Sequence, residues 1–195
     1  NSCRFNDGDS PEMVKTPNAG DVDKWTLSFW VKRGVLGTLQ TIVSAWTDSS
    51  NFTKIQFETT DQLTFYNATS GSTDGALKTN RLFRDPSAWM NIVCVWDSDN
   101  GTAGDRMKMY VNGVEETSFA TDTNPTQDLN SLMNGNIAHY IGQEGDDTDY
   151  FDGYLAEVVF IEALALTPTS FGEFDEDSPT IWKPKDISEL TYGTN

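Results

Sequence analysis

The sequence contains only two cysteines and one histidine, and it lacks an apolar run long enough to cross a membrane. Two cysteines do not make a disulfide framework. Cys94 alternates with valines in an apolar segment, which favours a buried free thiol, although a disulfide to Cys3 stays open. No serine or cysteine is positioned to make His139 a catalytic base, so a structural role is favoured for this histidine.

Basic residues are also scarce. Lysine and arginine number 13 against 30 aspartates and glutamates, which gives a formal net charge of -17. Such a chain repels phosphates, so we expect no nucleic-acid partner, no binding to an anionic membrane surface and no membrane insertion. The carboxylates either keep the protein soluble or converge on a cation. With 37% hydrophobic and 12% aromatic residues, the 195-residue chain is expected to fold.

The segment 89–119 carries the clearest fold signal. Residues 89–96 are apolar on both faces, which is typical of a strand inside a layered sheet. Residues 106–111 alternate, and Asn112-Gly113 then predicts a type I′ turn with a return strand over 114–119. A central strand beside a half-exposed hairpin indicates two packed antiparallel sheets.

Further short strands with turn residues between them predict an all-β jelly-roll sandwich of two antiparallel sheets. We expect a loop between Pro11 and Pro17 and one short helix starting at Thr167 and Pro168. The predicted domain spans 1–174. Residues 175–195 are expected to form an acidic tail or linker that packs on the domain or leaves it, with Trp182 and Tyr192 as candidate anchors.

Several motifs in this order resemble a known family. They are WTLSFWV at 25–31, WMNIV at 89–93, YVNG at 110–113, IGQEGD at 141–146, FDGYLAEV at 151–158 and ALALTP at 163–168. Together they resemble the laminin-G-like and pentraxin-like family of concanavalin A-like jelly rolls, over nearly the whole chain. The resemblance is specific for the fold and says less about function.

Other segments are similar to phage virion proteins that carry this module. They are SCRFN at 2–6, WVKR at 30–33, DPSAW at 85–89, SFGEF at 170–174, WKP at 182–184 and YGTN at 192–195. This resemblance implies a place on the phage particle surface, in a tail fibre, head fibre or capsid decoration protein. It also implies virion proteins and copies of the chain itself as partners, and exposure outside the cell once assembled.

The loop 143–149 is the sharpest candidate site. Its carboxylates and a glycine carbonyl match the oxygen ligands that Ca²⁺ prefers. The resemblance to pentraxins implies Glu144, the Gly145 carbonyl and Asp146 as ligands, with Asp48 and Asn51 from a second loop. Simple counting of strands places these two loops at opposite ends of the sandwich, and a solvated acidic loop is the alternative interpretation.

Aromatic residues at strand ends are candidates for sugar contact. Rings of Trp46, Phe52 and Tyr150 can stack on a glycan, or they can cap the core. The acidic run 173–177 resembles a glycosidase signature, but it lies in the tail and no acid pair is placed for catalysis.

We therefore predict a non-catalytic virion surface module that binds a host-surface glycan, with calcium as a possible cofactor. The first alternative is a purely structural capsid- or tail-attached protein without a ligand. The second alternative, a glycan hydrolase, is disfavoured.

Overall fold

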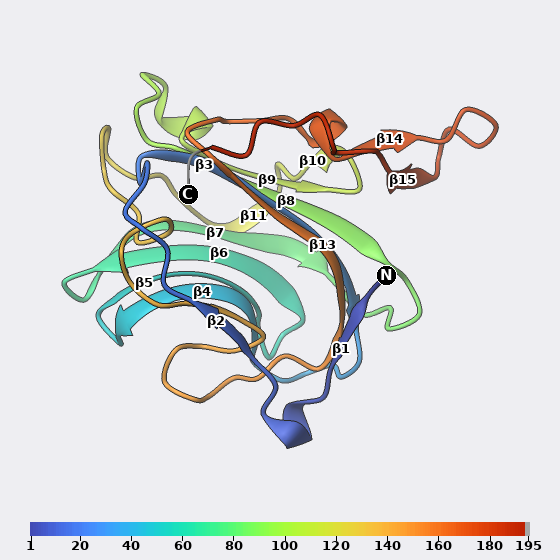
Figure 1. The fold of residues 1–195 in the computed structure, drawn as a ribbon, viewed down its shortest axis with the longest axis horizontal. Helices are drawn as coiled ribbons and strands as arrows, with labels where there is room; N and C mark the ends of the chain where they lie inside the picture. The colour runs from blue at the N-terminus through green and yellow to red at the C-terminus, as the bar shows by residue number, and fades with distance from the viewer. Residues whose placement is uncertain (194–195) are drawn as a thin grey trace.

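The computed structural model describes residues 1–193, which form two antiparallel β-sheets packed face to face (Figure 1). The predicted two-sheet sandwich is confirmed. The six-stranded sheet has the order β1 (Cys3–Phe5), β13 (Gly153–Glu162), β3 (Lys24–Arg33), β8 (Met90–Asp97), β9 (Met107–Val111) and β10 (Val114–Glu115).

The second sheet has seven strands and contains a segment that the sequence did not reveal as a strand. Its order is β11 (Phe119–Thr123), β7 (Ser72–Leu82), β6 (Gln62–Thr69), β5 (Asn51–Phe57), β4 (Gln40–Asp48), β12 (His139–Ile141) and β2 (Met13–Lys15). β2 replaces the loop expected between Pro11 and Pro17. All three of its residues are exposed, so it has no apolar pattern, and it exists because it pairs with the free edge of β12.

The core lies between the sheets, and its centre is aromatic. Trp25 of β3 and Trp96 of β8 stack with ring centroids 6.5 Å apart, and both contact Phe65 of β6 in the other sheet. All three rings are fully buried. The Trp25 indole N–H donates to the Ser131 hydroxyl at 2.8 Å, which attaches the long loop before β12 to the core.

The hairpin prediction is confirmed at its turn and wrong for its return strand. Asn112 and Gly113 have φ angles of 49° and 79°, as a type I′ turn requires. The return strand is only the two-residue β10, because the chain then leaves for the opposite sheet, where Phe119 starts β11 and packs against the core.

The described residues contain three helical segments, each a single 3-10 turn: η1 (Asp7–Asp9), η2 (Ala103–Asp105) and η3 (Pro168–Ser170). The short helix expected at Thr167 is therefore only the turn η3, because Gly172 already starts strand β14. None of these segments is long and apolar enough to span a membrane.

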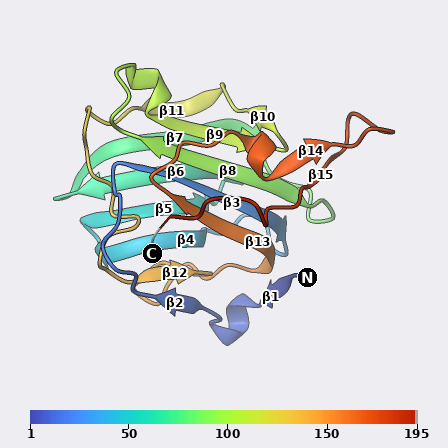
Figure 2. The same ribbon diagram turned by 45° about the horizontal axis from the view of Figure 1, so that its top comes forward.

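The last described residues pack on the outer side of the six-stranded sheet. β14 (Gly172–Phe174) and β15 (Trp182–Pro184) form a hairpin that projects beyond the sandwich (Figure 2). This hairpin pairs the end of the predicted domain 1–174 with the predicted tail 175–195. The Trp182 indole N–H donates to Asn91 Oδ1 at 3.1 Å. The Glu162 N–H donates to the Tyr192 carbonyl at 3.3 Å, whereas Thr194 and Asn195 lie outside the described residues.

Both cysteines are free: Cys3 is exposed, and Cys94 is buried among core side chains as a thiol. This confirms the buried free thiol and excludes the disulfide between them in this structure. Burial raises the pKa of the Cys94 thiol well above its usual value, so this group stays protonated and unreactive.

A buried ion pair fixes one end of the sandwich. The Arg33 guanidinium, fully buried over the Phe57 ring, donates to Asp61 Oδ1 at 3.0 Å and to the Phe83 carbonyl at 2.7 Å. Burial acts to raise the pKa of Asp61, but the Gly37 N–H and the guanidinium groups of Arg84 and Arg33 outweigh it and lower this pKa. Asp61 is therefore ionised in the fold and compensates the buried charge of Arg33.

We expect the substitution Asp61→Asn to reduce the free energy of unfolding by about 3 kcal/mol, because it leaves the Arg33 charge buried without a counter-ion. Urea denaturation measures this change. The control is Glu12→Gln, which alters an exposed carboxylate and should leave the midpoint unchanged. Equal stability of Asp61→Asn and the original chain would contradict this account of the pair.

Candidate functional site

An aromatic cluster lies on the outer face of the seven-stranded sheet, separate from the core. It consists of Trp46, Phe52 and Ala68, with Tyr66 and Tyr140 packed against them. Trp46 and Phe52 stack with ring centroids 5.3 Å apart, and the Tyr66 ring meets Phe52 edge-on at 5.0 Å. Alternation explains their position, because their strand neighbours Ala45 and Ile55 point into the core.

A buried ion pair adjoins this cluster. The Lys54 ammonium donates to both carboxylate oxygens of Glu144 at 2.8 Å, and it lies 4.6 Å from the Phe52 ring centroid and 5.9 Å from that of Trp46. Both residues are less than 9% exposed. The cation is thus held by a carboxylate and by two aromatic faces in a partly dry environment.

The acidic loop crosses the outer face of β4 and brings Glu144 to this position. The Ser44 hydroxyl donates to the Gln143 carbonyl at 3.1 Å, and the Thr41 N–H donates to the Asp149 carbonyl at 2.8 Å. Between these anchors, Gly145 lies so close to the Trp46 side chain that a Cβ atom there would collide with it. A glycine is therefore required where the loop passes over the ring.

Glu144 is more basic than an ordinary glutamate. Burial raises its pKa, Lys54 opposes this effect through a hydrogen bond and its charge, and the neighbouring Asp149 carboxylate adds to the increase. The net result is a raised pKa at the centre of the loop. The like charges of Glu144 and Asp149 are tolerated because Lys54 lies against Glu144.

Beneath the loop, several polar side chains have hydrogen-bonding capacity that no described residue uses. Gln143 is fully buried, yet neither its amide nitrogen nor its amide oxygen has a partner among residues 1–193. The same holds for the Gln56 amide oxygen and the Thr41 hydroxyl, and these two residues face each other across β4 and β5. Such groups are costly unless something pairs with them.

The five predicted calcium ligands do not gather around one point. Asp48 accepts hydrogen bonds from the Ser50 N–H and the Asn51 amide, which lower its pKa, in a turn at the far end of β4. Asp146 accepts from the Thr148 hydroxyl, and Glu144 is held by Lys54. Within residues 1–193, no group of three or more acidic, histidine or cysteine side chains is arranged to hold a metal.

These residues therefore do not fit a calcium ion in the arrangement observed, because the Lys54 ammonium already neutralises the carboxylate of Glu144, one of the predicted ligands. The acidic loop runs over the outer face of β4 from Thr41 to Trp46, whereas Asp48 and Asn51 lie in the turn beyond Trp46. Calcium binding stays a prediction that this geometry does not favour.

Two of the three predicted glycan contacts, Trp46 and Phe52, lie together in the aromatic cluster, whereas Tyr150 is half-buried outside it. Trp46 and Phe52 are largely covered by their neighbours. The half-buried rings of Tyr66 and Tyr140 are the members nearest to solvent. Sequence reasoning missed Lys54, although its alternation with Phe52 and Gln56 places all three on one face of β5.

The other candidate groups have structural partners. The His139 ring accepts a hydrogen bond at Nε2 from the Asn134 N–H and contacts the Ile137 carbonyl through Nδ1. Burial lowers the pKa of His139, so the ring is neutral at pH 7, and its predicted structural role is confirmed. Glu173 and Asp175 of the acidic run both pair with Lys183 across the β14–β15 hairpin.

The sequence and the fold match a known class. A sequence model of the laminin-G type, described as the concanavalin A-like lectin/glucanases superfamily, matches residues 7–170. The match covers most of the chain. The protein belongs to the concanavalin A-like lectin/glucanase superfamily.

Solved structures share the fold at low sequence identity. A heptameric pentraxin of Limulus polyphemus is 18% identical with a TM-score of 0.56, over 84% of this chain and 72% of that one. Mouse laminin alpha1 domains LG4-5 are 13% identical with a TM-score of 0.57, over 85% of this chain and 45% of that one.

A third structure is a sialidase carbohydrate-binding module of Ruminococcus gnavus bound to α2,3-sialyllactose. It is 10% identical with a TM-score of 0.52, over 82% of this chain and 95% of that one. A comparison with curated protein sequences gives no match.

The Lys54–Glu144 pair can be tested by a double-mutant cycle. We expect Lys54→Met and Glu144→Gln each to reduce the free energy of unfolding by about 3 kcal/mol, because each leaves one buried charge unpaired. The double variant should lose much less than the sum of these two effects. Strictly additive losses would show that the two side chains do not interact in solution.

Calcium binding is tested by thermal unfolding with and without millimolar CaCl₂, the range used by extracellular modules. The pairing of Glu144 with Lys54 predicts an unchanged melting temperature. A clear increase that is lost in Asp146→Asn, but kept in Asp147→Asn, would instead support the calcium prediction and show that the loop rearranges around the ion.

Proposed function

We propose that the chain is a non-catalytic carbohydrate-binding module, and that the glycan lies on the outer face of the seven-stranded sheet. The observation that carries this proposal is the aromatic cluster of Trp46, Phe52, Tyr66 and Tyr140 on the solvent side of β4, β5, β6 and β12. The core between the sheets is complete without these rings, so their gathering on the outside indicates a binding surface.

The aromatic surface is held in a fixed orientation. The Tyr66 hydroxyl shares a hydrogen bond of 2.6 Å with the Thr73 hydroxyl of the neighbouring strand, and its ring rests on the edge of Phe52. The Lys54–Glu144 pair packs against the Phe52 and Trp46 rings on the same face of the sheet and restricts their movement. A rigid aromatic platform binds a sugar face with little loss of side-chain entropy.

Polar groups suited to sugar hydroxyls lie around the platform. The Asp48 carboxylate lies exposed at one side and keeps acceptor capacity beyond the hydrogen bond that the Asn51 amide donates to it. Amides and carboxylates both pair with hydroxyl groups. Since the loop is acidic and the Lys54 charge is already compensated, this surface favours a neutral glycan over one that carries carboxylates or sulfates.

The comparisons support the proposal at the level of the superfamily, which is named for lectins as well as glucanases. The Ruminococcus gnavus module with the same fold carries a bound sialylated sugar. For this chain, the acidic surroundings of the cluster argue for a different, uncharged sugar.

A glycan array probed with the labelled chain should give binding to neutral oligosaccharides. We expect Tyr66→Ala and Tyr140→Ala each to weaken binding at least about fivefold, the loss typical of a stacked aromatic contact. The matched control is Tyr154→Ala, which removes an exposed ring from the opposite sheet. A flat array, or equal binding by all variants, would refute the proposed site.

We further propose that this module is displayed on a phage particle, in a tail fibre, head fibre or capsid decoration protein, where it recognises a host-surface glycan. This proposal rests on the resemblance of residues 2–6, 30–33, 85–89, 170–174, 182–184 and 192–195 to virion proteins. We expect antibodies against the chain to label purified particles in immunogold electron microscopy. Labelling of lysate proteins alone, with bare particles, would contradict it.

The alternative is a purely structural role, in which the chain attaches to virion proteins and to its own copies. One observation favours it: Met13 and Val14 of the edge strand β2 are 47% and 51% exposed. An unpaired apolar edge can add a strand from another molecule. Sedimentation of the isolated chain as a stable oligomer, together with a flat glycan array, would favour this alternative.

A further inference from the structure

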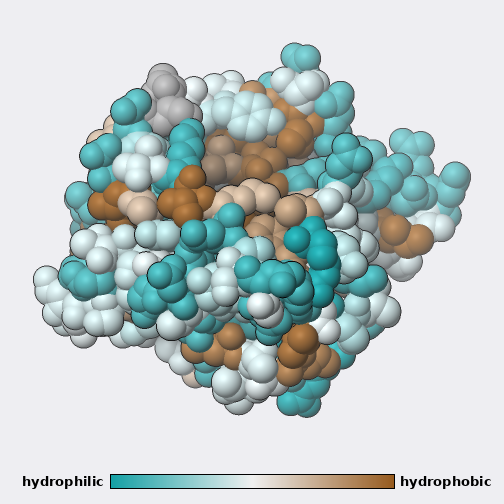
Figure 3. Space-filling view, turned by 60° about the horizontal axis from the view of Figure 1, so that its bottom comes forward, coloured by the Kyte–Doolittle hydropathy of each residue, from teal (hydrophilic) through white to brown (hydrophobic). Residues whose placement is uncertain are grey.

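A second surface, distinct from the aromatic cluster, is a cavity of about 360 Å³ at the open edge of the sandwich. It lies between the strands β2, β12 and β4 of one sheet and β13 and β3 of the other. Figure 3 shows an apolar hollow on this side of the molecule. Its wall is mostly apolar and includes Leu27, Val43, Met133, Ile141, Val158 and Phe160.

Irregular strands open this space. β4 shifts register between Thr41 and Val43, and β13 shifts register between Ala156 and Val159, so a bulge lies on each side of the cavity. In β13 the bulge includes Glu157 with φ of 48°, a conformation that is strained for this residue. Bulges that re-aim side chains are frequent beside binding sites.

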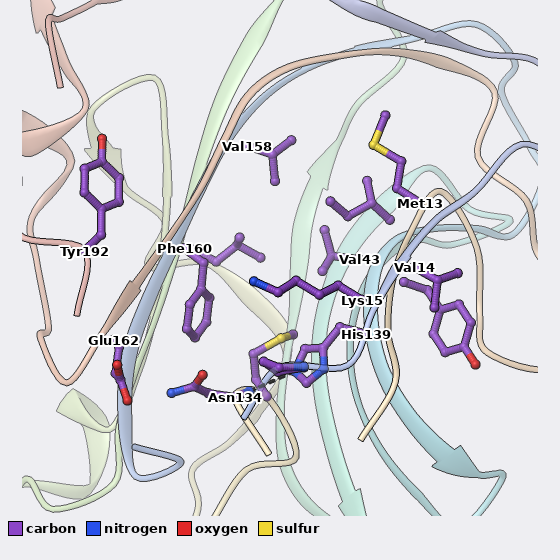
Figure 4. A pocket seen from close by; sticks show the side chains of 15 residues that line it. Met13, Val14, Lys15, Val43, Asn134, His139, Val158, Phe160, Glu162 and Tyr192 are labelled. Atoms are coloured by element: carbon purple, nitrogen blue, oxygen red, sulfur yellow. Dashed lines mark hydrogen bonds between the residues drawn. The ribbon is translucent and has the colours of Figure 1, made fainter. Parts of the chain in front are cut away.

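Few polar groups face this cavity, and they differ in charge. His139 is neutral and engaged by Asn134, and Glu162 accepts a hydrogen bond from the Asp21 N–H at 3.0 Å. Lys15 of β2 extends its side chain into the cavity (Figure 4). No carboxylate among residues 1–193 lies within ion-pair distance of the Lys15 ammonium.

Lys15, like Lys32 and Lys185, has no ion pair within residues 1–193, but it is the lysine that lines this apolar cavity. A ligand that suits this site needs an apolar body for the space between the sheets and an anionic group for Lys15. The cavity is at the small end of ligand sites, which suits a short, unbranched molecule.

We propose that this cavity binds a medium-chain monocarboxylic acid, with its alkyl chain between the sheets and its carboxylate against the Lys15 ammonium. The alkyl chain contacts Val43, Val158 and Phe160, whose burial supplies most of the affinity. The carboxylate forms a charge-assisted hydrogen bond at the mouth, which gives the selectivity. This site is distinct from the glycan surface, because Trp46, Phe52 and Tyr66 of the aromatic cluster do not line the cavity, although Tyr140 borders both.

The experiment is calorimetric titration of the full chain with octanoate, 1-octanol and octylamine, which share one alkyl chain and differ in charge. We expect saturable binding in the order octanoate, octanol, octylamine. Lys15→Met keeps the apolar stem and removes the charge, so it should weaken octanoate binding about tenfold and leave octanol binding unchanged.

Two further variants locate the ligand. Val158→Trp fills the cavity and should abolish binding of octanoate and octanol, whereas the matched change Val158→Ala should keep both; thermal unfolding checks that each variant is folded. Absence of saturable octanoate binding to the original chain would overturn the proposal. Tighter binding of octylamine than of octanoate would also overturn it, since Glu162 rather than Lys15 would then anchor the ligand.

Discussion

The contact on which the rest of the structure depends is the aromatic junction between the two sheets. Trp25 and Trp96 come from adjacent strands of one sheet, and Phe65 from the middle of the other, so their packing sets how the sheets face each other. The Trp25 N–H also holds Ser131. That bond positions the loop that leads into β12, the strand shared by the outer aromatic cluster and the cavity. Sheet packing and site geometry are therefore coupled through one residue.

Much of the fold was predictable because its signals are local. Alternation in β3 and β9, the two-sided apolar pattern of β8 and the Asn112-Gly113 turn each reflect a requirement that neighbouring residues satisfy together. The errors occur where pairing with distant residues decides the structure. Exposed β2 is a strand only because β12 lies beside it. The return strand after Gly113 ends early, since Phe119 gains more by packing in the opposite sheet.

The candidate site was predictable only in part, for the same physical reason. Trp46 and Phe52 were predictable because aromatic residues at strand ends are candidates for sugar contact from the sequence alone. Their partner Lys54 lies 90 residues from Glu144, and no local pattern reveals that a buried ammonium will meet the acidic loop. The loop looked like a calcium site because carboxylates cluster in its sequence. In the fold, the Lys54 ammonium pairs with the Glu144 carboxylate of this loop. The spacing of residues in the sequence does not reveal this contact, which changes what the loop can bind.

Strands β4 and β12 serve two surfaces at once. Because side chains alternate across a sheet, Trp46 points outward to the proposed glycan platform, whereas Val43, His139 and Ile141 lie on the inner side that borders the cavity. Tyr140 packs on the platform and also lines the cavity, so it belongs to both surfaces. A substitution at Tyr140 therefore affects both surfaces, whereas Tyr66 of the aromatic cluster does not line the cavity and Lys15 does not belong to the cluster. A loss of sugar binding through Tyr66 and a loss of carboxylic-acid binding through Lys15 are therefore separable results.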